Sequence, residues 1–220
     1  MGIYQSQNEV ESYRNADGNL IQPLAVAGDV KFQDVNGDGI ISAKDRINAG
    51  NSFPSLTYAL NGSANYKGFD MSMLWTGSHG NKIFNGLKYG GVFMQGATYN
   101  NSPEILNRWT PESPSSTLPR VTIKDLNNNK VYSTLYIEEG SFLRLKYLTF
   151  GYTFNESILK KSAVKLRVFT SLQNLITFTK YTGFDPEIGA DIESSGNMYG
   201  VDRGAYPQAK AFILGLNFTF

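Results

Sequence analysis

The chain has 220 residues, and its 20 Lys and Arg against 19 Asp and Glu leave a formal charge of +1. This near-neutral balance, with no run of Lys or Arg, argues against a nucleic-acid-binding protein, and the lack of Cys excludes disulfides and argues against a zinc site. The sequence has no stretch of about eighteen apolar residues, so no transmembrane helix is predicted. Its 14 Phe, 13 Tyr and 22 Gly instead favour a β-barrel with a polar interior and an apolar exterior.

Residues 1–55 show no strand-like alternation, and we expect a loop region. They lack a charged head followed by an apolar core, so a signal peptide is expected upstream if the protein is exported. The segment DVNGDGIISAKD has calcium-loop spacing, because oxygen ligands alternate along it and a glycine permits the sharp turn. The expected ligands are Asp34, Asn36, Asp38, the carbonyl of Ile40, Ser42 and Asp45. The alternative is an Asn/Asp/Gly turn cluster without a metal.

Two strands joined by a two-residue turn are predicted next. Leu56–Tyr66 and Phe69–Gly77 both alternate with period two, and Lys67-Gly68 lies between them, which is typical of a β-hairpin. Aromatic and aliphatic residues dominate one face of each segment, so each strand is expected to separate two different environments.

Residues 79–141 are expected to be mainly loop. Tyr132–Glu138 is a candidate sixth strand, whereas Ile83–Met94 is too rich in glycine to assign. A proline-studded stretch follows from Trp109 to Pro114. Nearby aromatic residues could stack on sugar rings or pack the loop on itself, and we favour packing; they are Trp109, Tyr99 and Phe93.

Two more strands are predicted at Phe142–Phe154 and Val164–Asn174, joined by a short polar connection. In the second, mostly apolar even positions alternate with mostly polar odd positions. In the first, Arg144 and Lys146 interrupt the apolar stripe that Leu148, Phe150, Tyr152 and Phe154 continue.

The segment YTGFDPE contains Asp185 and Glu187, which could serve as the acid and base of a glycosidase. We expect the Asp185 and Glu187 side chains to point in opposite directions, and Pro186 stiffens the chain. We therefore favour a capped turn in an outer loop. We expect no enzymatic activity, because the sequence also lacks a nucleophile elbow, a phosphate loop and a His-rich metal site.

The last segment, Ala211–Phe220 (AFILGLNFTF), alternates strictly and ends on an aromatic residue. About ten residues is the length with which a tilted strand crosses a bilayer. Such a terminal strand is common in outer-membrane barrels.

The connections between these strands alternate in length. Two turns are short, and three segments are long: residues 1–55, about 79–141 and 175–209. Short turns on one side and long loops on the other are the pattern of bacterial outer-membrane barrels. These barrels have an even number of strands, eight or more, and five strands would leave two unpaired edges.

We therefore predict the C-terminal part of a larger antiparallel transmembrane β-barrel. Residues 1–55 would be an extracellular loop region with the calcium-like motif, and residues 56–220 would supply strands and extracellular loops of one partial domain. Polar groups expected to face the interior are Asn61, Asn65, Gln173 and Asn217. A complete soluble β-sandwich is the alternative.

Several segments together resemble the SusC/RagA family of TonB-dependent outer-membrane transporters. They are DVNGDGIISAKDR from Asp34, YKGFDMS from Tyr66, NRWTPE from Asn107, SFLRLKYLTFGY from Ser141, Gln173-Asn174-Leu175, Gly183–Glu187 and the terminal Phe220. The resemblance spans nearly the whole chain, in order, and covers the final third or less of the barrel domain.

This resemblance implies a barrel of about 22 strands with a plug, in the cell outer membrane and in contact with its lipid. It also implies energy from the TonB complex through an N-terminal part absent here, and a SusD-like surface lipoprotein that captures oligosaccharides or peptides. The competing hypothesis is a secreted calcium-dependent module that binds a glycan or protein. A plug domain and signal peptide upstream would favour the transporter.

Overall fold

The computed structural model describes residues 2–91, 101–154, 165–188, 190–191 and 198–219. The chain falls into two compact units. The strand unit consists of residues 51–83, 139–200 and 205–220, and the loop unit of residues 1–50, 84–138 and 201–204. Each unit is thus assembled from three separate stretches of chain. The predicted boundary between residues 55 and 56 stays a prediction.

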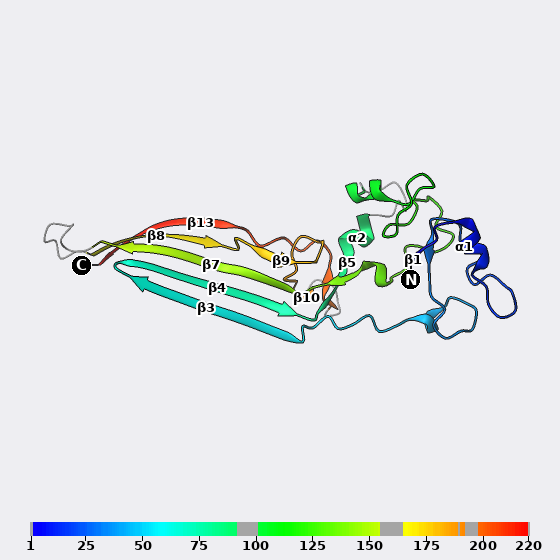
Figure 1. Ribbon diagram of the computed structural model, residues 1–220, viewed down its shortest axis with the longest axis horizontal. Helices are drawn as coiled ribbons and strands as arrows, with labels where there is room; N and C mark the ends of the chain where they lie inside the picture. The colour runs from blue at the N-terminus through cyan, green and yellow to red at the C-terminus, as the bar shows by residue number, and fades with distance from the viewer. Residues whose placement is uncertain (1, 92–100, 155–164, 189, 192–197, 220) are drawn as a thin grey trace. The chain divides into compact units, whose positions relative to one another are not determined.

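The strand unit holds an antiparallel sheet in the order β13–β8–β7–β4–β3 (Figure 1). Its long strands are β3 (Leu56–Tyr66), β4 (Phe69–His79), β7 (Phe142–Thr153), β8 (Lys165–Gln173) and β13 (Ala211–Thr219). A short strand, β9 (Thr177–Thr179), continues along the start of β7, and β10 (Ala190–Asp191) pairs with β11 (Met198–Tyr199). The five predicted strands are therefore confirmed within the described residues; Val164, Phe220 and residues 155–163 lie outside them.

A tight turn joins β3 to β4 because both residues between them adopt positive φ. Lys67 has a φ of 47° and Gly68 a φ of 89°, as a type I′ hairpin turn requires. A Cβ atom on Gly68 would also come within 2.8 Å of the carbonyl oxygen of Thr153. The register then runs without a break from Tyr66 opposite Phe69 to the far ends of both strands.

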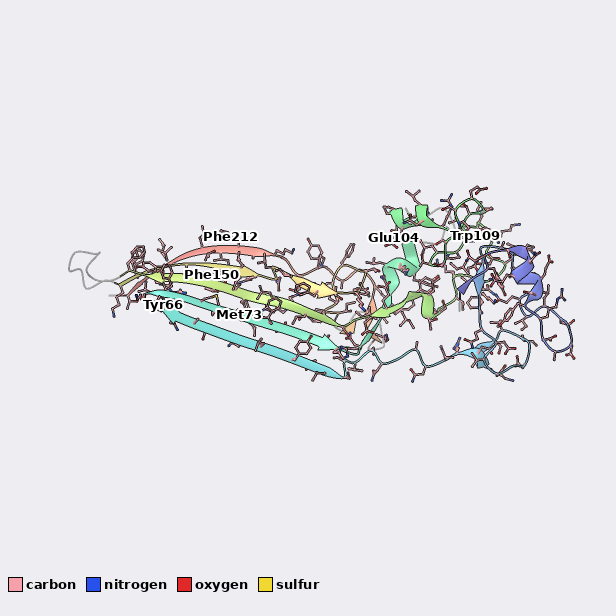
Figure 2. The ribbon with its side chains drawn as sticks, in the orientation of Figure 1. Tyr66, Met73, Glu104, Trp109, Phe150 and Phe212 are labelled. Atoms are coloured by element: carbon pink, nitrogen blue, oxygen red, sulfur yellow. The ribbon has the colours of Figure 1, made fainter. Side chains whose placement is uncertain are left out.

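The register separates apolar from polar side chains, because directly opposed residues of antiparallel strands share a face. Leu60 opposes Trp75, for example, and the same face continues across all five long strands. This apolar face comprises Leu56, Tyr58, Leu60, Tyr66, Phe69, Met71, Met73, Trp75, Leu143, Leu145, Leu148, Phe150, Tyr152, Leu166, Val168, Leu172, Phe212, Leu214, Leu216 and Phe218. Figure 2 labels four of these residues on their strands, Tyr66, Met73, Phe150 and Phe212.

Aromatic rings gather at both ends of the apolar face. Near the β3–β4 turn, the ring centroid of Tyr152 lies 4.6 Å from that of Phe69 and 4.9 Å from that of Phe154. Near the other end of the strands, Trp75 stacks on Phe178 of β9 at 6.3 Å. An apolar band bordered by aromatic residues is typical of the lipid-facing wall of a membrane barrel.

A β-bulge in β7 changes which of its residues belong to the apolar face. Residues 74 and 75 of β4 oppose residues 147 and 145 of β7, which leaves Lys146 as the extra residue. Leu143 and Leu145 therefore join Leu148 on the apolar face, and Arg144 lies on the polar face. The prediction that Arg144 and Lys146 interrupt the apolar stripe was wrong, because the stripe changes parity at the bulge.

The sixth predicted strand is wrong over most of its length. Residues 134–136 form the 3₁₀ helix η3 (Thr134–Tyr136), and the strand β6 (Ile137–Glu139) begins only after it. Tyr136 is fully buried, so packing of this ring overrides the β propensity of the segment. The glycine-rich stretch before it starts with β5 (Lys82–Asn85) and α2 (Gly86–Gly91), and β12 (Val201–Asp202), β5 and β6 form a small sheet in that order.

The loop unit has a core of its own, although its segments were predicted as long loops. Its other elements are β1 (Gly2–Ile3), α1 (Gln7–Ser12), β2 (Val30–Lys31), and the 3₁₀ helices η1 (Ala43–Asp45) and η2 (Pro103–Asn107). Tyr4, Val10 and Ala25 pack in one buried cluster, and Leu118 and Tyr136 pack in a second. No helix of the described residues is long and apolar enough to span a membrane.

A buried polar network ties the loop unit together across the sequence. The carboxylate of Asp29 is fully buried and accepts hydrogen bonds from Arg120 Nε at 2.6 Å and Asn129 Nδ2 at 2.8 Å. Gln22 Nε2 donates to Asn127 Oδ1 at 2.9 Å. Because buried polar groups are costly unless bonded, these pairs fix residues 22–30 against residues 120–129.

Candidate functional site on the polar face of the sheet

The second face of the sheet is lined mainly by small hydroxyl and amide side chains. Register places Asn61, Asn65, Gln173 and Asn217, the four residues expected to face an interior, on this same face. Their polar neighbours there are Thr57, Ser63, Asp70, Ser72, Thr76, Thr149, Arg167, Ser171 and Thr219. The same face also carries five large apolar side chains, Leu74, Phe142, Tyr147, Phe169 and Ile213. The sheet therefore separates a face for an apolar medium from one that water can wet.

An ion pair crosses this polar face near the β3–β4 turn. Arg167 on β8 donates through Nε to Asp70 Oδ1 on β4 at 2.8 Å, and through Nη2 to Oδ2 at 2.5 Å. The pair spans Gly151 on the strand between them, where a Cβ atom would lie 2.5 Å from Asp70 Oδ1. The guanidinium also lies 4.8 Å from the ring centroid of Phe169. The two charges neutralise each other, and glycine in β7 makes the bidentate geometry accessible.

A second ionic cluster surrounds Arg144, at the end of the polar face away from that turn. Its side chain is only 3% exposed, and it donates to Asp185 Oδ1 at 2.6 Å and to Glu187 Oε2 at 2.8 Å. Arg144 Nε donates to Thr177 Oγ1 at 2.9 Å, and Lys146 Nζ lies 2.8 Å from Glu187 Oε2. Residues after β9 therefore fold back over the polar face of β7.

The expectation that Asp185 and Glu187 point in opposite directions is wrong, because residues two apart on an extended segment lie on the same side. The Glu187 amide donates to Asp185 Oδ1 at 2.9 Å, and this turn brings both carboxylates to one guanidinium. Burial opposes ionisation of Asp185, but the Arg144 guanidinium and the amides of Gln208 and Glu187 outweigh it, so the pKa of Asp185 lies below its ordinary value. A carboxylate held in its charged form does not suit the proton-donor role in glycoside hydrolysis.

The predicted calcium-loop residues form a closed set of turns. Asp34 accepts the amides of Gly37 and Gly39, each at 2.8 Å, and both glycines have positive φ. Asn36 Oδ1 accepts the Asp38 amide at 3.0 Å, and Asn36 Nδ2 donates to Asp38 Oδ2 at 2.9 Å. The chain therefore turns at Gly37 and Gly39, and the assignment of these residues as calcium ligands stays a prediction.

The end of this loop is capped by its last acidic residue. Asp45 accepts the amides of Ser42 at 2.7 Å and Val35 at 2.9 Å, so it joins the loop's two ends. The Ser42 amide, aided by that of Val35 and opposed by burial, lowers the pKa of Asp45. The Ile40 side chain is 65% exposed, and its amide donates to Asp38 Oδ1. Within the described residues no three His, Cys, Asp or Glu side chains converge as a metal site.

Trp109 is the one aromatic residue of the proline-studded stretch that can be placed. The residue is 7% exposed, and its ring lies against Gly28, where a Cβ atom would overlap Trp109 Cε3. The favoured prediction, packing rather than an exposed sugar platform, is confirmed for this residue. Tyr99 and Phe93 lie outside the described residues.

Sequence reasoning missed the roles of Arg144 and Asp29. A signal for Arg144 was present, because apolar residues at 143 and 145 are followed by others at 148, 150 and 152, and the step of three marks a bulge. Asp29 had no such signal, since its partners lie 91 and 100 residues away.

Comparisons with known proteins agree with this architecture. No family model matches the chain. It is 33% identical over its whole length to "TonB-dependent receptor P3" of Formosa agariphila, and it covers 21% of that protein. It is 27% identical over 86% of its length to "TonB-dependent receptor SusC" of Bacteroides thetaiotaomicron, covering 17% of it.

A solved structure of the RagAB peptide transporter matches 83% of this chain and 19% of its own, with a TM-score of 0.68 and 26% identity. The chain thus spans about a fifth of the length of the relatives it matches. Over its whole length it is related to TonB-dependent receptors of the SusC/RagA type, and it matches a part of their β-barrel.

Proposed function

We propose that this chain is one arc of the wall of a TonB-dependent outer-membrane importer. The observation that supports it most is the register, which puts mainly apolar side chains on one face of five long strands and most of the polar ones on the other. The apolar face would contact lipid, and the polar face would line the barrel interior. An eleven-residue strand is about 36 Å long and, tilted by about 45°, crosses about 25 Å, the height of a barrel's apolar band.

The arc needs further strands to work as a wall. Within the described residues, β3 and β13 are the two edges of the sheet, and lipid does not tolerate an open edge. We propose that strands outside this chain pair with both edges and close the barrel. In this role the chain contributes wall and outer loops and carries no catalytic activity.

The partners follow from the relatives rather than from contacts of this chain. SusC and the RagAB peptide transporter are the named relatives, so we propose a SusD-like lipoprotein above the barrel. The TonB complex would act through a part outside these residues. The cargo would be an oligosaccharide or a peptide, both of which suit an interior rich in hydroxyl and amide groups. The relatives do not favour a secreted calcium-dependent module.

The test is uptake by cells that carry the complete barrel. We expect labelled oligosaccharides or peptides to accumulate only when both the barrel protein and TonB are present. A deletion strain that takes up every such cargo at the parental rate would contradict the proposal. So would recovery of the complete protein in the soluble fraction.

We further propose that the loop from Asp34 to Asp45 binds Ca²⁺ and stiffens an outer loop. Carboxylate and amide oxygens suit a hard cation, and each carboxylate oxygen that accepts one amide keeps a second lone pair. Calorimetric titration should show Ca²⁺ binding that Asp34→Asn abolishes. Asp17→Asn is the control, because Asp17 lies in an exposed turn outside the loop. If no heat of Ca²⁺ binding is measured, the loop is an Asn/Asp/Gly turn cluster without a metal.

A further inference from the structure

Arg144 is the most deeply buried charge on the polar face. Its guanidinium serves three residues of the segment that follows β8, namely Thr177, Asp185 and Glu187. An arginine this enclosed is costly unless its donors are satisfied. The burial of Arg144 therefore indicates that the segment around residues 180–187 covers its guanidinium.

Asp185 joins three separate stretches of chain at this point. Besides the Arg144 guanidinium, its carboxylate accepts the Glu187 amide and, through Oδ2, the amide of Gln208 at 2.9 Å. Gln208 belongs to the stretch that leads into β13. The single carboxylate thus connects β7, the segment after β9 and the approach to β13.

The strand is shaped to aim Arg144 at these partners. Without the bulge at Lys146, residue 144 would share the face of Leu148 and point to the apolar side. The extra residue at the bulge, Lys146, also binds this segment, because it forms an ion pair with Glu187, the more exposed of the two carboxylates.

We propose that Arg144 is a positioning residue that holds the segment of residues 180–187 folded across the polar face, so that this segment narrows the passage through the barrel. The proposal rests on the proposed function, since only there does the polar face line a passage. We name the contacts of Arg144 with Asp185 and Glu187 the Arg144 latch. Opening the latch should widen the passage without removing any wall strand.

The first test measures the latch itself, whether or not the protein transports anything. Hydrogen–deuterium exchange of the complete barrel in lipid nanodiscs is compared between the parent and Arg144→Gln. We expect the Glu187 and Gln208 amides to exchange about tenfold faster in the variant, while the β3–β4 hairpin stays protected. Unchanged exchange at these two amides would overturn the latch.

The second test measures the passage during transport, because the plug blocks the barrel otherwise. TonB-dependent uptake of labelled peptides and oligosaccharides of increasing size is compared for the parent, Arg144→Gln and Asp185→Asn. We expect both variants to take up the larger cargo several-fold faster, Arg144→Lys to recover part of the size limit, and the double variant to differ from the parent no more than either single one.

The control is Arg167→Gln, which removes the other arginine of the polar face and leaves the latch intact. The parental size limit in a variant with faster exchange would show that the segment moves without narrowing a passage, and would overturn the proposal. A size limit shifted as far in Arg167→Gln as in Arg144→Gln would overturn it as well. If Arg144→Gln does not reach the membrane, it is replaced by Glu187→Gln, which breaks only the exposed branch of the latch. Its amide exchange and its size limit are then judged by the same criteria.

Discussion

The apolar face makes a quantitative prediction at Leu214. This side chain lies near the middle of β13 (Ala211–Thr219) and is 70% exposed, so its replacement removes little packing within the chain. On a soluble protein, Leu214→Arg would therefore change the stability by about 0.5 kcal/mol or less. Facing hydrocarbon near the bilayer midplane, the same arginine should cost about 2–4 kcal/mol.

The assay is folding of the complete barrel into lipid vesicles across a urea series, followed by the mobility shift of the folded form in gels. Ile213→Arg is the matched control, because Ile213 is next to Leu214 on the strand but lies on the polar face, opposite Ser171. We expect Leu214→Arg to lower the midpoint strongly and Ile213→Arg to leave it nearly unchanged. Equal effects, or a larger effect at Ile213, would refute the assignment of the two faces.

Three further predictions concern the loops. Gly28→Ala should cost about 2 kcal/mol or more, because its Cβ atom would overlap the Trp109 ring. Gly18→Ala, also at positive φ but with open space, should cost only the backbone strain of about 1 kcal/mol. Trp fluorescence during thermal unfolding separates the two, and equal costs would refute the packing. Arg120→Ala removes the cationic partner of the buried Asp29 carboxylate and should destabilise the loop unit by about 3 kcal/mol. Faster proteolysis of the loops in this unit would measure the loss of stability. The pKa of Asp185 is lowered in the folded state, so its stabilising contribution is fully present above the unfolded value near 3.8 and is lost as the pH falls through the folded value. The hydrogen-exchange protection factors of the Glu187 and Gln208 amides, which Asp185 accepts, should therefore stay constant from about pH 5 to 8. Loss of this protection already near pH 6 would contradict the prediction.

The strands could be predicted because alternation is a local property of the sequence. The hairpin at Lys67-Gly68 carries its turn within two residues, and the last strand carries its period within ten. The structure contains the predicted hairpin and, from Ala211 to Thr219, the predicted strand. The bulge at Lys146 was also encoded locally, as a step of three between apolar residues, but strict alternation was applied across it.

The loop unit could not be predicted in the same way. Its burial depends on pairs such as Asp29 and Asn129, which are 100 residues apart, and neither residue lies in a periodic segment. The arginine that binds Asp185 and Glu187 is likewise distant in sequence, 41 and 43 residues away. Long-range polar contacts of this kind leave no pattern that a single sequence can reveal.

The dispersed origin of the loop unit restricts how its surface can be exchanged between related receptors. Grafting residues 1–50 from another receptor would leave Arg120 and Asn129 without their shared carboxylate acceptor unless the donor carries one at the same place. A chimera that transplants residues 1–50 together with residues 84–138 and 201–204 keeps these contacts within one source. Outer-surface diversity in such proteins should therefore be inherited in matched sets of distant segments rather than loop by loop.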